Sequence, residues 1–339
     1  MNGFDYFRQS AKNSYKHFRS TLKVNEQKVY DKIVDGFFDY SNSITVFGVT
    51  IDVIQSIFEK IRQDIPSLFF VENVSFQYMP LTRLGSVIPK YRFDKGKTEA
   101  TLVALYTKCQ SILGFINLNS DLEKEKGIHD YFCRNVIYDN SFAASSFECV
   151  GPLLFGKGVC EGISRAAKLL FDFVGVKSLV VHGESSQQQG ITNSSSSLHA
   201  WNMVNINSVF YHLDITFDLT IQAFDIVRYD YYNLSDAEIC ADHIIHSSSI
   251  PKCTQRNSYY LAHGMFMMTQ KDFIEYLQKC IKSKQRDIVF QLPVVSDVER
   301  VKEKITEIVS KYAFRPFSFL SQYQLASNET QFVFHLHFM

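Results

Sequence analysis

The chain has 339 residues, of which 46% are hydrophobic, and its 35 Lys and Arg residues balance 35 Asp and Glu residues. This length and apolar content predict a full hydrophobic core divided into two or three structural units. A net charge of zero without a basic run argues against a nucleic-acid partner. No apolar run reaches the roughly 18 residues that a membrane-spanning helix needs, so no transmembrane segment is expected.

The cysteines and the first residues bear on the compartment. Seven cysteines, an odd number scattered along the chain, are typical of reduced thiols rather than a disulfide framework. The opening Met-Asn-Gly-Phe-Asp-Tyr-Phe-Arg lacks the apolar stretch of a signal peptide. We therefore expect a cytoplasmic protein, although a chain trimmed of an export signal would show the same pattern. The sequence gives no indication of the oligomeric state.

Residues 1–95 are predicted to form an N-terminal region of helices followed by strands. Apolar stripes within 29–38 and 53–61 have the three- and four-residue spacing of helices, which we expect up to about residue 66. Residues 68–78 and 86–93 have the composition of strands. Pro89 predicts that the second of these lies at a sheet edge, because proline cannot donate to the ladder.

Residues 96–250 are predicted to form the central domain, beginning with helices at about 97–116 and 120–135. The stretch Gly156-Lys-Gly-Val-Cys160-Glu-Gly162 comes next, and apolar residues at helical spacing follow it. Gly175 stands where a helix C-cap glycine belongs. We therefore place Cys160 in the first turn of a buried helix, where unpaired N–H groups stabilise a thiolate and lower the pKa of the thiol.

A base for this cysteine is predicted on a hairpin further along the chain. Segments 198–204 and 209–216 have the pattern of two strands, and Asn207-Ser208 between them is a turn signal. With either Asn207-Ser208 or Ile206-Asn207 as the loop, His199 and Asp214 fall on the same sheet face within side-chain reach. A cysteine packed on that face would complete the arrangement Cys160–His199–Asp214 that nucleophilic catalysis uses.

Three linked blocks of sequence resemble the transglutaminase-like core, a papain-like superfamily with a Cys-His-Asp triad. They are Gly156–Gly162, His199-Ala-Trp-Asn202 and Tyr211-His-Leu-Asp214-Ile-Thr-Phe-Asp218. Flanking residues resemble the bacterial branch, and the likeness covers roughly residues 90 to 245. The resemblance implies that Cys160 is the nucleophile, His199 the base and Asp214 the orienter. Many members carry Tyr-Ala after the glycine, whereas this chain has Ile163-Ser164.

The resemblance implies an α+β fold, in which the helix that bears Cys160 packs on an antiparallel sheet that bears His199 and Asp214. An N-terminal helical region and a small C-terminal α/β unit are expected on either side. We take as candidates for the oxyanion site or the cleft the residues Tyr138, Asp139, Trp201 and Asn202. Candidates for lining the substrate site are Glu161, Tyr229 and Tyr231. The polar loop 183–197 could be a lid over the cleft or a solvated insertion.

Residues 255–339 are predicted to form the small C-terminal unit. Its pattern is a helix at 270–283, a strand at 287–293, a helix at 296–312 and strands at 316–325 and 330–338, with a hairpin turn at Ser327-Asn328. Before this unit, Cys240, His243, His246 and Cys253 have a spacing that could suggest zinc, although structural zinc sites are usually tighter. We expect no metal and no cofactor.

The function expected from these residues is cysteine-dependent acyl transfer on amide bonds through a thioester. Hydrolysis is favoured over transfer to an amine, because no cluster of calcium-binding carboxylates accompanies the triad. The substrate class would be a peptide or a protein. Two alternatives stay open: a non-catalytic transglutaminase-like binding or scaffold protein, and a true protein-glutamine transglutaminase.

Overall fold

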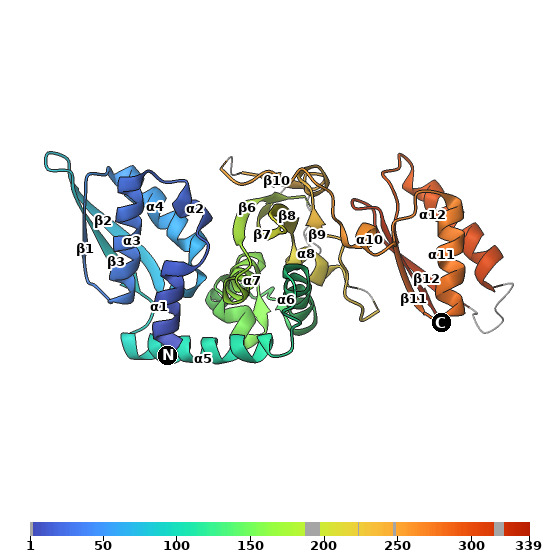
Figure 1. The fold of residues 1–339 in the computed structure, drawn as a ribbon, viewed down its shortest axis with the longest axis horizontal. Coiled ribbons are helices and arrows are strands. Elements are labelled where there is room, and N and C mark those ends of the chain that lie inside the picture. Colours follow the sequence, from blue (N-terminus) through green and yellow to red (C-terminus); the bar gives the residue numbers. More distant parts are fainter. Residues whose placement is uncertain (1–2, 187–196, 223, 247–248, 315–321) are drawn as a thin grey trace.

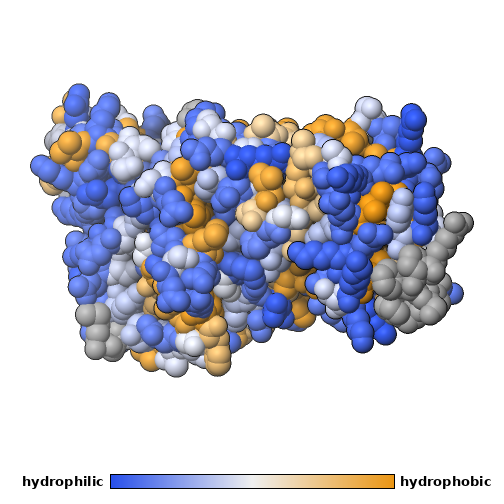
Figure 2. All heavy atoms as spheres, turned by 45° about the vertical axis from the view of Figure 1, so that its right-hand side comes forward, coloured by the Kyte–Doolittle hydropathy of each residue, from blue (hydrophilic) through white to orange (hydrophobic). Residues whose placement is uncertain are grey.

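The computed structural model describes residues 3–186, 197–222, 224–246, 249–314 and 322–339. Helices and mainly antiparallel sheets alternate along the chain, which confirms the predicted α+β class. Figure 1 shows three parts in succession along the longest axis, with α5 (Lys95–Leu113) running beneath the first two. On the face in Figure 2, hydrophilic side chains cover most of the surface, with apolar patches between them.

The N-terminal part packs helices against a three-stranded antiparallel sheet of order β1-β3-β2. Its helices are α1 (Gly3–Asn13), α2 (His17–Ser20), α3 (Val24–Phe38) and α4 (Ile51–Asp64), and its strands are β1 (Ile44–Phe47), β2 (Val71–Met79) and β3 (Leu84–Tyr91). Strand β1 lies within the stretch that the sequence predicted as helical. That prediction was wrong there, because a four-residue strand carries too short a pattern to outweigh its helical neighbours.

The prediction of an edge strand at Pro89 was also wrong, since β3 is the central strand of this sheet. The reason it tolerates proline is that β1 pairs with β3 only from Leu84 to Val87. At Pro89 only β2 is paired, through Val74. The missing N–H therefore falls on a stretch that has a ladder partner on one side only.

The central part holds a five-stranded antiparallel sheet of order β10-β6-β7-β8-β9. Its strands are β6 (Ser178–Ser185), β7 (Ser197–Ile206), β8 (Val209–Leu213), β9 (Tyr232–Leu234) and β10 (His243–Ile245). Its helices are α5, α6 (Asp121–Asn135), α7 (Cys160–Val174), α8 (Ile215–Thr220) and α9 (Asp236–Ile239). A short parallel pair, β4 (Ile137–Tyr138) with β5 (Lys157–Gly158), and two helical turns, η2 (Ala144–Phe147) and η3 (Gly151–Phe155), lead into α7.

The hairpin that joins β7 to β8 adopts the first of the two predicted loops. Ile206 pairs with Val209, and Asn207 and Ser208 have φ angles of 52° and 70°. Two central residues with positive φ are the hallmark of a turn whose twist matches that of the strands. Helix α7 likewise follows the sequence, since it begins at Cys160 and ends at Gly175 with a left-handed φ of 74°.

The C-terminal part packs helices on one three-stranded sheet of order β11-β13-β12. Its elements are α10 (Tyr259–Ala262), α11 (Gln270–Lys282), β11 (Asp287–Gln291), α12 (Val298–Val309), the turn η4 (Ser310–Phe314), β12 (Tyr323–Asn328) and β13 (Val333–Phe338). The hairpin turn at Ser327-Asn328 was predicted too early, because both residues are still paired with β13. Residues 316–321 of the first predicted strand lie outside the described residues.

The described residues form three hydrophobic cores, one of which contains Trp201 and Phe217, whose rings lie beside His199. The larger core runs without a break from the N-terminal helices through α6 and α7 to one face of the central sheet. Within it Ile163, Ala166 and Leu170 of α7 are completely buried, and burying one leucine side chain contributes roughly 1.5–3 kcal/mol. A separate core lies inside the C-terminal part, between residues 267 and 338. The nucleophile helix is thus held by the N-terminal and central parts together.

Candidate active site

Cys160 is the first residue of α7, so its backbone N–H has no partner within the helix. The thiol is half-buried, whereas five of the other six cysteines are buried and Cys240 is exposed. None of the seven, all of which lie in described residues, forms a disulfide. The turn η2 packs directly on this helix start, since a Cβ atom added to Gly162 would lie 2.1 Å from the Ser146 carbonyl oxygen.

Hydrogen bonds fix the start of α7 against β7. Ser164 Oγ lies 3.0 Å from the Ala200 carbonyl oxygen, and Asn202 Nδ2 donates to the Ser164 carbonyl oxygen at 2.9 Å. Ser164 is the second residue of the Ile163-Ser164 departure from the family pattern. The sequence analysis did not predict that Ser164 joins the cysteine helix to the histidine strand. The unusual serine at this position was the feature that could have indicated it.

His199 and Asp214 form a buried pair on one face of the sheet. His199 Nε2 lies 2.6 Å from Asp214 Oδ2, and the two side chains are 1% and 0% exposed. Asp214 is fixed in turn because its Oδ1 accepts the backbone N–H of Phe217 at the start of α8. Since Nε2–H donates to the carboxylate, the neutral ring presents the lone pair of Nδ1, a buried atom without a hydrogen-bond partner among the described residues.

The electrostatics of this pair favour a charged imidazole. Burial alone would lower the pKa of His199, but the charge and hydrogen bond of Asp214 and the neighbouring Cys160 thiol raise it to about 10. Burial would likewise raise the pKa of Asp214, but the charge of His199 outweighs it and holds that pKa well below its ordinary value. The side chains of Cys160, His199 and Asp214 are therefore close enough to act on one another's charge.

Of the predicted oxyanion and cleft candidates, Tyr138 is close enough to Cys160 and Asp214 for their charges to act on its hydroxyl. Burial, then the charges of Cys160 and Asp214, raises its pKa to about 12, so its hydroxyl stays protonated. Asp139 is buried in the turn that follows, where it accepts hydrogen bonds from Ser141 and from the Ala143 backbone. Its carboxylate shapes the loop before α7 and does not point to a substrate.

The structure places Trp201 and Asn202 inside the protein with their donors already engaged. Trp201 Nε1 donates to His212 Nδ1 at 3.0 Å, and the Trp201 ring lies nearly parallel to the His199 ring at 5.8 Å between centroids. Asn202 donates to Ser164, as described above. Both residues are buried and support the histidine strand, and the Trp201 ring has no second N–H to offer a tetrahedral oxyanion.

The three residues predicted to line the substrate site have partners within the protein. Glu161 bonds Arg165 Nε and His182 Nε2, each at 2.6 Å. Tyr229 is buried and donates its hydroxyl to Asp130 Oδ1 at 2.8 Å. Tyr231, also buried, donates to Asp242. We therefore leave Glu161, Tyr229 and Tyr231 out of the proposed substrate site.

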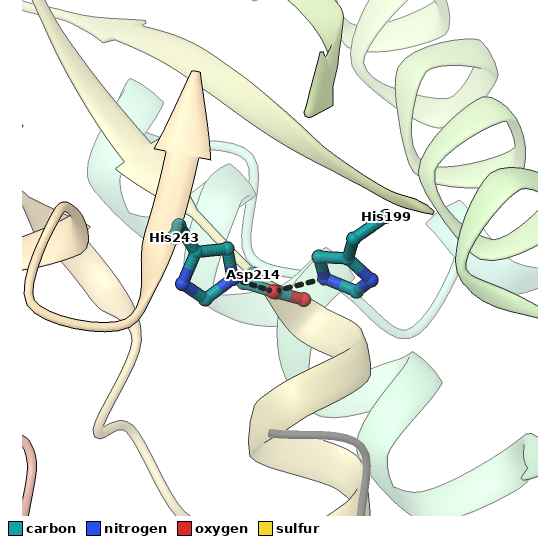
Figure 3. Close-up of side chains that lie close together, drawn as sticks. All are labelled: His199, Asp214 and His243. Atoms are coloured by element: carbon teal, nitrogen blue, oxygen red, sulfur yellow. Dashed lines mark hydrogen bonds and ion pairs between the residues drawn. The ribbon is translucent and has the colours of Figure 1, made fainter. Parts of the chain in front are cut away.

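A second histidine at this site was missed by the sequence analysis. His243, the first residue of β10, is buried, and its Nε2 lies 3.0 Å from Asp214 Oδ2 (Figure 3). The sequence weighed His243 only as part of a zinc set, and the structure does not gather that set. Cys240 is exposed and His246 pairs with Glu184.

Cys253, the remaining member of that set, lies instead beside His212 and Asp236. His212 Nδ1 accepts the Trp201 N–H, so the neutral ring carries its proton on Nε2, 3.0 Å from Asp236 Oδ1. A metal ion on Nε2 would displace that proton from the only nitrogen that can hold it. This cluster therefore fits a proton-bearing hydrogen-bond network better than a metal centre, and we assign it no ligand role.

The polar loop 183–197 is only partly described. Gly183 to Ser185 belong to β6 and Ser197 begins β7, while residues 187–196 lie outside the described residues. A cavity of about 1170 Å³ is lined by residues that include Tyr15, Asp172 and Lys177. Asp172 is 12 residues along α7 from Cys160, roughly 18 Å at 1.5 Å per residue. That cavity is not part of the site.

Comparisons with known proteins bear on the same residues. Residues 114–215 match the model of the transglutaminase-like superfamily. No curated protein matches the chain. Among the described helices, none has the length and hydropathy that would let it cross a membrane.

Two solved structures are similar over part of the chain. One, described as a TGase, is 15% identical, with a TM-score of 0.31 over 56% of this chain and 54% of its own. The other, from Cytophaga hutchinsonii and named provisionally as a cysteine protease, is 11% identical, with a TM-score of 0.28 over 42% of this chain and 61% of its own. The chain thus spans between half and two thirds of these structures, and the likeness is remote.

Proposed function

We propose, from the premise that this chain is a transglutaminase-like protein, that it catalyses cysteine-dependent acyl transfer on amide bonds and releases the acyl group by hydrolysis. The observation that supports this most is the buried His199–Asp214 pair, which leaves His199 Nδ1 open beside a helix that begins at a half-buried cysteine. The substrate class that we propose is a peptide or a protein.

The first half of the reaction forms a thioester. His199 Nδ1 takes the thiol proton, and the Cys160 thiolate attacks the amide carbonyl carbon to give a tetrahedral intermediate. As the C–N bond breaks, the imidazolium gives its proton to the leaving amine. Asp214 keeps the Nε2 proton in place and stabilises the imidazolium that forms in between.

The second half consumes water. His199 removes a proton from a water molecule, whose oxygen attacks the thioester carbon. The C–S bond then breaks, the acid product leaves, and the thiol regains a proton. An amine in place of water would give transamidation, so the same residues serve either acceptor.

The developing oxyanion requires hydrogen-bond donors on one side of Cys160. The unpaired Cys160 backbone N–H at the start of α7 is the first donor that we propose. The hydroxyl of Tyr138 is the second, because its raised pKa keeps the proton on the oxygen throughout the neutral range. These two groups take the place of Trp201, which donates to His212, and of Asn202, which holds β7 against α7.

The rate at which each cysteine is alkylated by iodoacetamide tests this proposal without a known substrate. An ordinary thiol of pKa about 8.5 is mostly protonated at pH 6, so it reacts slowly there. If exposure alone decided the rate, the exposed Cys240 would react faster than Cys160. We expect the reverse at pH 6, because the His199 imidazolium stabilises the Cys160 thiolate. Mass mapping of the modified peptides gives both rates in one sample.

His199→Ala provides the control. We expect it to slow alkylation of Cys160 at pH 6 by at least about tenfold and to leave Cys240 unchanged. Equal rates for Cys160 in both proteins would show that no thiolate–imidazolium pair exists, and would favour a binding or scaffold role. If the pair is found, peptide libraries with and without an added primary amine would separate hydrolysis from transamidation.

A further inference from the structure

The Asp214 carboxylate is shared by two histidines, His199 of β7 and His243 of β10, whose rings lie on either side of it (Figure 3). Both His199 Nε2 and His243 Nε2 point at the same oxygen, Oδ2, at 2.6 and 3.0 Å. All three side chains are at most 1% exposed. A carboxylate that only had to orient one imidazole would need one such partner, so the second requires an explanation.

The other nitrogen of His243 defines its charge. His243 Nδ1 lies 2.6 Å from Asp242 Oδ1, so a carboxylate oxygen faces each nitrogen of the ring. Ionised carboxylates only accept hydrogen bonds, and each ring nitrogen must therefore carry a proton. The second oxygen of Asp242 accepts the Tyr231 hydroxyl. Buried between Asp214 and Asp242, the ring is an imidazolium.

The remaining groups around His243 leave this charge in place. The rings of Phe217, Trp201, His199 and Tyr231 lie with centroids 4.7, 5.0, 5.3 and 5.8 Å from it. Across the sheet, β6 places Ser185 opposite His243, and the Glu184 carboxylate pairs with His246 instead. Burial opposes the charge, but the hydrogen bonds to Asp214 and Asp242 outweigh it and raise the pKa of His243.

We propose that His243 is a positioning residue of the active site, a fixed cation that anchors the Asp214 carboxylate and moderates its pull on His199. This inference rests on the proposed function. Because the His243 imidazolium also donates to Asp214 Oδ2, this carboxylate attracts a proton onto His199 less strongly than an unshared carboxylate would. His199 can then give up its proton to the leaving amine, which a more strongly held imidazolium would do poorly.

The pH profile of Cys160 alkylation separates this role from a structural one. In wild type we expect a lower inflection, where the thiolate–imidazolium pair forms, and an upper one, where His199 loses its proton. His243→Gln keeps an N–H donor toward Asp214 but removes the positive charge. Because a nearby cation favours the Cys160 thiolate and disfavours the charged form of His199, both inflections should rise in this variant, by about one pH unit.

His246→Gln is the matched control, since it removes a carboxylate-paired histidine three residues away at the surface. We expect its profile to superimpose on that of the wild type. A His243→Gln protein that is folded and alkylated at an altered rate, but with both inflections unmoved, would show that His243 only fills space, and would overturn the proposal.

A measurement on the unmodified protein covers the case in which His243→Gln does not fold. In ¹⁵N-histidine spectra at pH 7, His243 should show both ring nitrogens protonated. One unprotonated nitrogen at that pH would overturn the proposal. If instead Cys160 in wild type shows no lower inflection and does not respond to His199→Ala, it is the proposed function that fails. The histidine spectrum would then still report the charge of His243.

Discussion

The carboxyl group of Glu125 on α6 is completely buried beneath β9. Its Oε2 accepts hydrogen bonds from Tyr232 Oη and Asn233 Nδ2, each at 2.9 Å, while Oε1 is buried without a partner among the described residues. Burial is the dominant effect and, although the two hydrogen bonds oppose it, raises the pKa of Glu125 to about 7. Near neutral pH this side chain is thus close to its own titration point.

This raised pKa predicts a pH-dependent stability. The folded state binds the Glu125 proton more tightly than the unfolded state, so the free energy of unfolding falls as pH rises from about 4.5 to about 7. The fall amounts to about 3 kcal/mol at 1.36 kcal/mol per pKa unit. Glu125→Gln cannot titrate, so its stability relative to wild type should grow over this range and stay constant above it. Urea unfolding at pH 4.5, 6, 7 and 8 measures the difference, and a difference independent of pH would contradict the prediction.

At the scale of elements, the start of α7 is positioned by the close approach of η2. Gly162 makes this possible, because any side chain there would meet the Ser146 carbonyl oxygen. The added Cβ atom is attached directly to the backbone, and the Ser146 carbonyl oxygen is part of it. Neither atom can therefore rotate away as the end of a flexible side chain would. The first turn of the helix, which carries Cys160, therefore depends on a residue without a Cβ atom.

Gly162→Ala should accordingly cost stability and disturb the nucleophile. We expect a loss of about 1–3 kcal/mol in the free energy of unfolding, as overpacking in tight contacts usually gives, together with slower alkylation of Cys160 at pH 6. Gly96→Ala is the control in the first turn of α5, where an added Cβ would lie 3.5 Å from Asp94 Oδ1, an ordinary contact. It should be neutral or stabilising by up to about 1 kcal/mol. Equal effects of the two variants would contradict the role of Gly162.

Local signals in the sequence were sufficient for α7 and for the β7–β8 hairpin. The helical apolar spacing and Gly175 define α7, and Asn207-Ser208 sets the register that brings His199 to Asp214. These features depend on neighbours within about 20 residues of chain. The pairing of His199 with Asp214 could therefore be predicted from the residues themselves, whereas the class of fold was predicted from the resemblance of the three sequence blocks to a known family.

The contact of His243 with Asp214 could not be predicted from such local signals. It stands on a three-residue strand at the far edge of the sheet, and only the order β10-β6-β7-β8 brings it to Asp214. Tyr229 and Tyr231 were misjudged for a similar reason. Whether a tyrosine points outward or inward depends on a buried acceptor. Their acceptors are Asp130 and Asp242, and no local pattern in the sequence predicts that these carboxylates lie there.

At the scale of the whole molecule, the N-terminal part is tied to the nucleophile helix by polar contacts as well as by a shared core. Lys168 of α7 is completely buried, and its Nζ bonds the Tyr15 carbonyl oxygen and Asp172. About one turn earlier in the helix, Arg165 bonds Glu148, which also bonds Arg92 of the N-terminal part. Loosening the N-terminal helices should therefore disturb α7. Most buried residues of the C-terminal part form a core of their own, and of its buried apolar residues that the structure describes, only Tyr260 and Val333 belong to the larger core.

Two equivalent isoleucine-to-alanine substitutions, one in each core, test whether the two cores are independent. Ile61 on α4 and Ile281 on α11 are at most 1% exposed, and each belongs to a different core. Ile61→Ala and Ile281→Ala should each cost about 2–5 kcal/mol, because the same methyl groups are removed from a packed interior. Ile61→Ala should increase amide hydrogen exchange in α7 and β7 as well as in the N-terminal helices, since these elements share one core.

Ile281→Ala should increase exchange only between about residue 255 and the C-terminus, and Cys160 should be alkylated at the wild-type rate. Exchange followed by mass spectrometry under identical conditions shows both patterns. If the effect of Ile61→Ala ended near residue 95, the N-terminal part would be an independent unit and the nucleophile helix would rest on the central part alone. If the effect of Ile281→Ala reached α7, the two cores would unfold together, and the C-terminal part would have to be counted among the elements that hold the site.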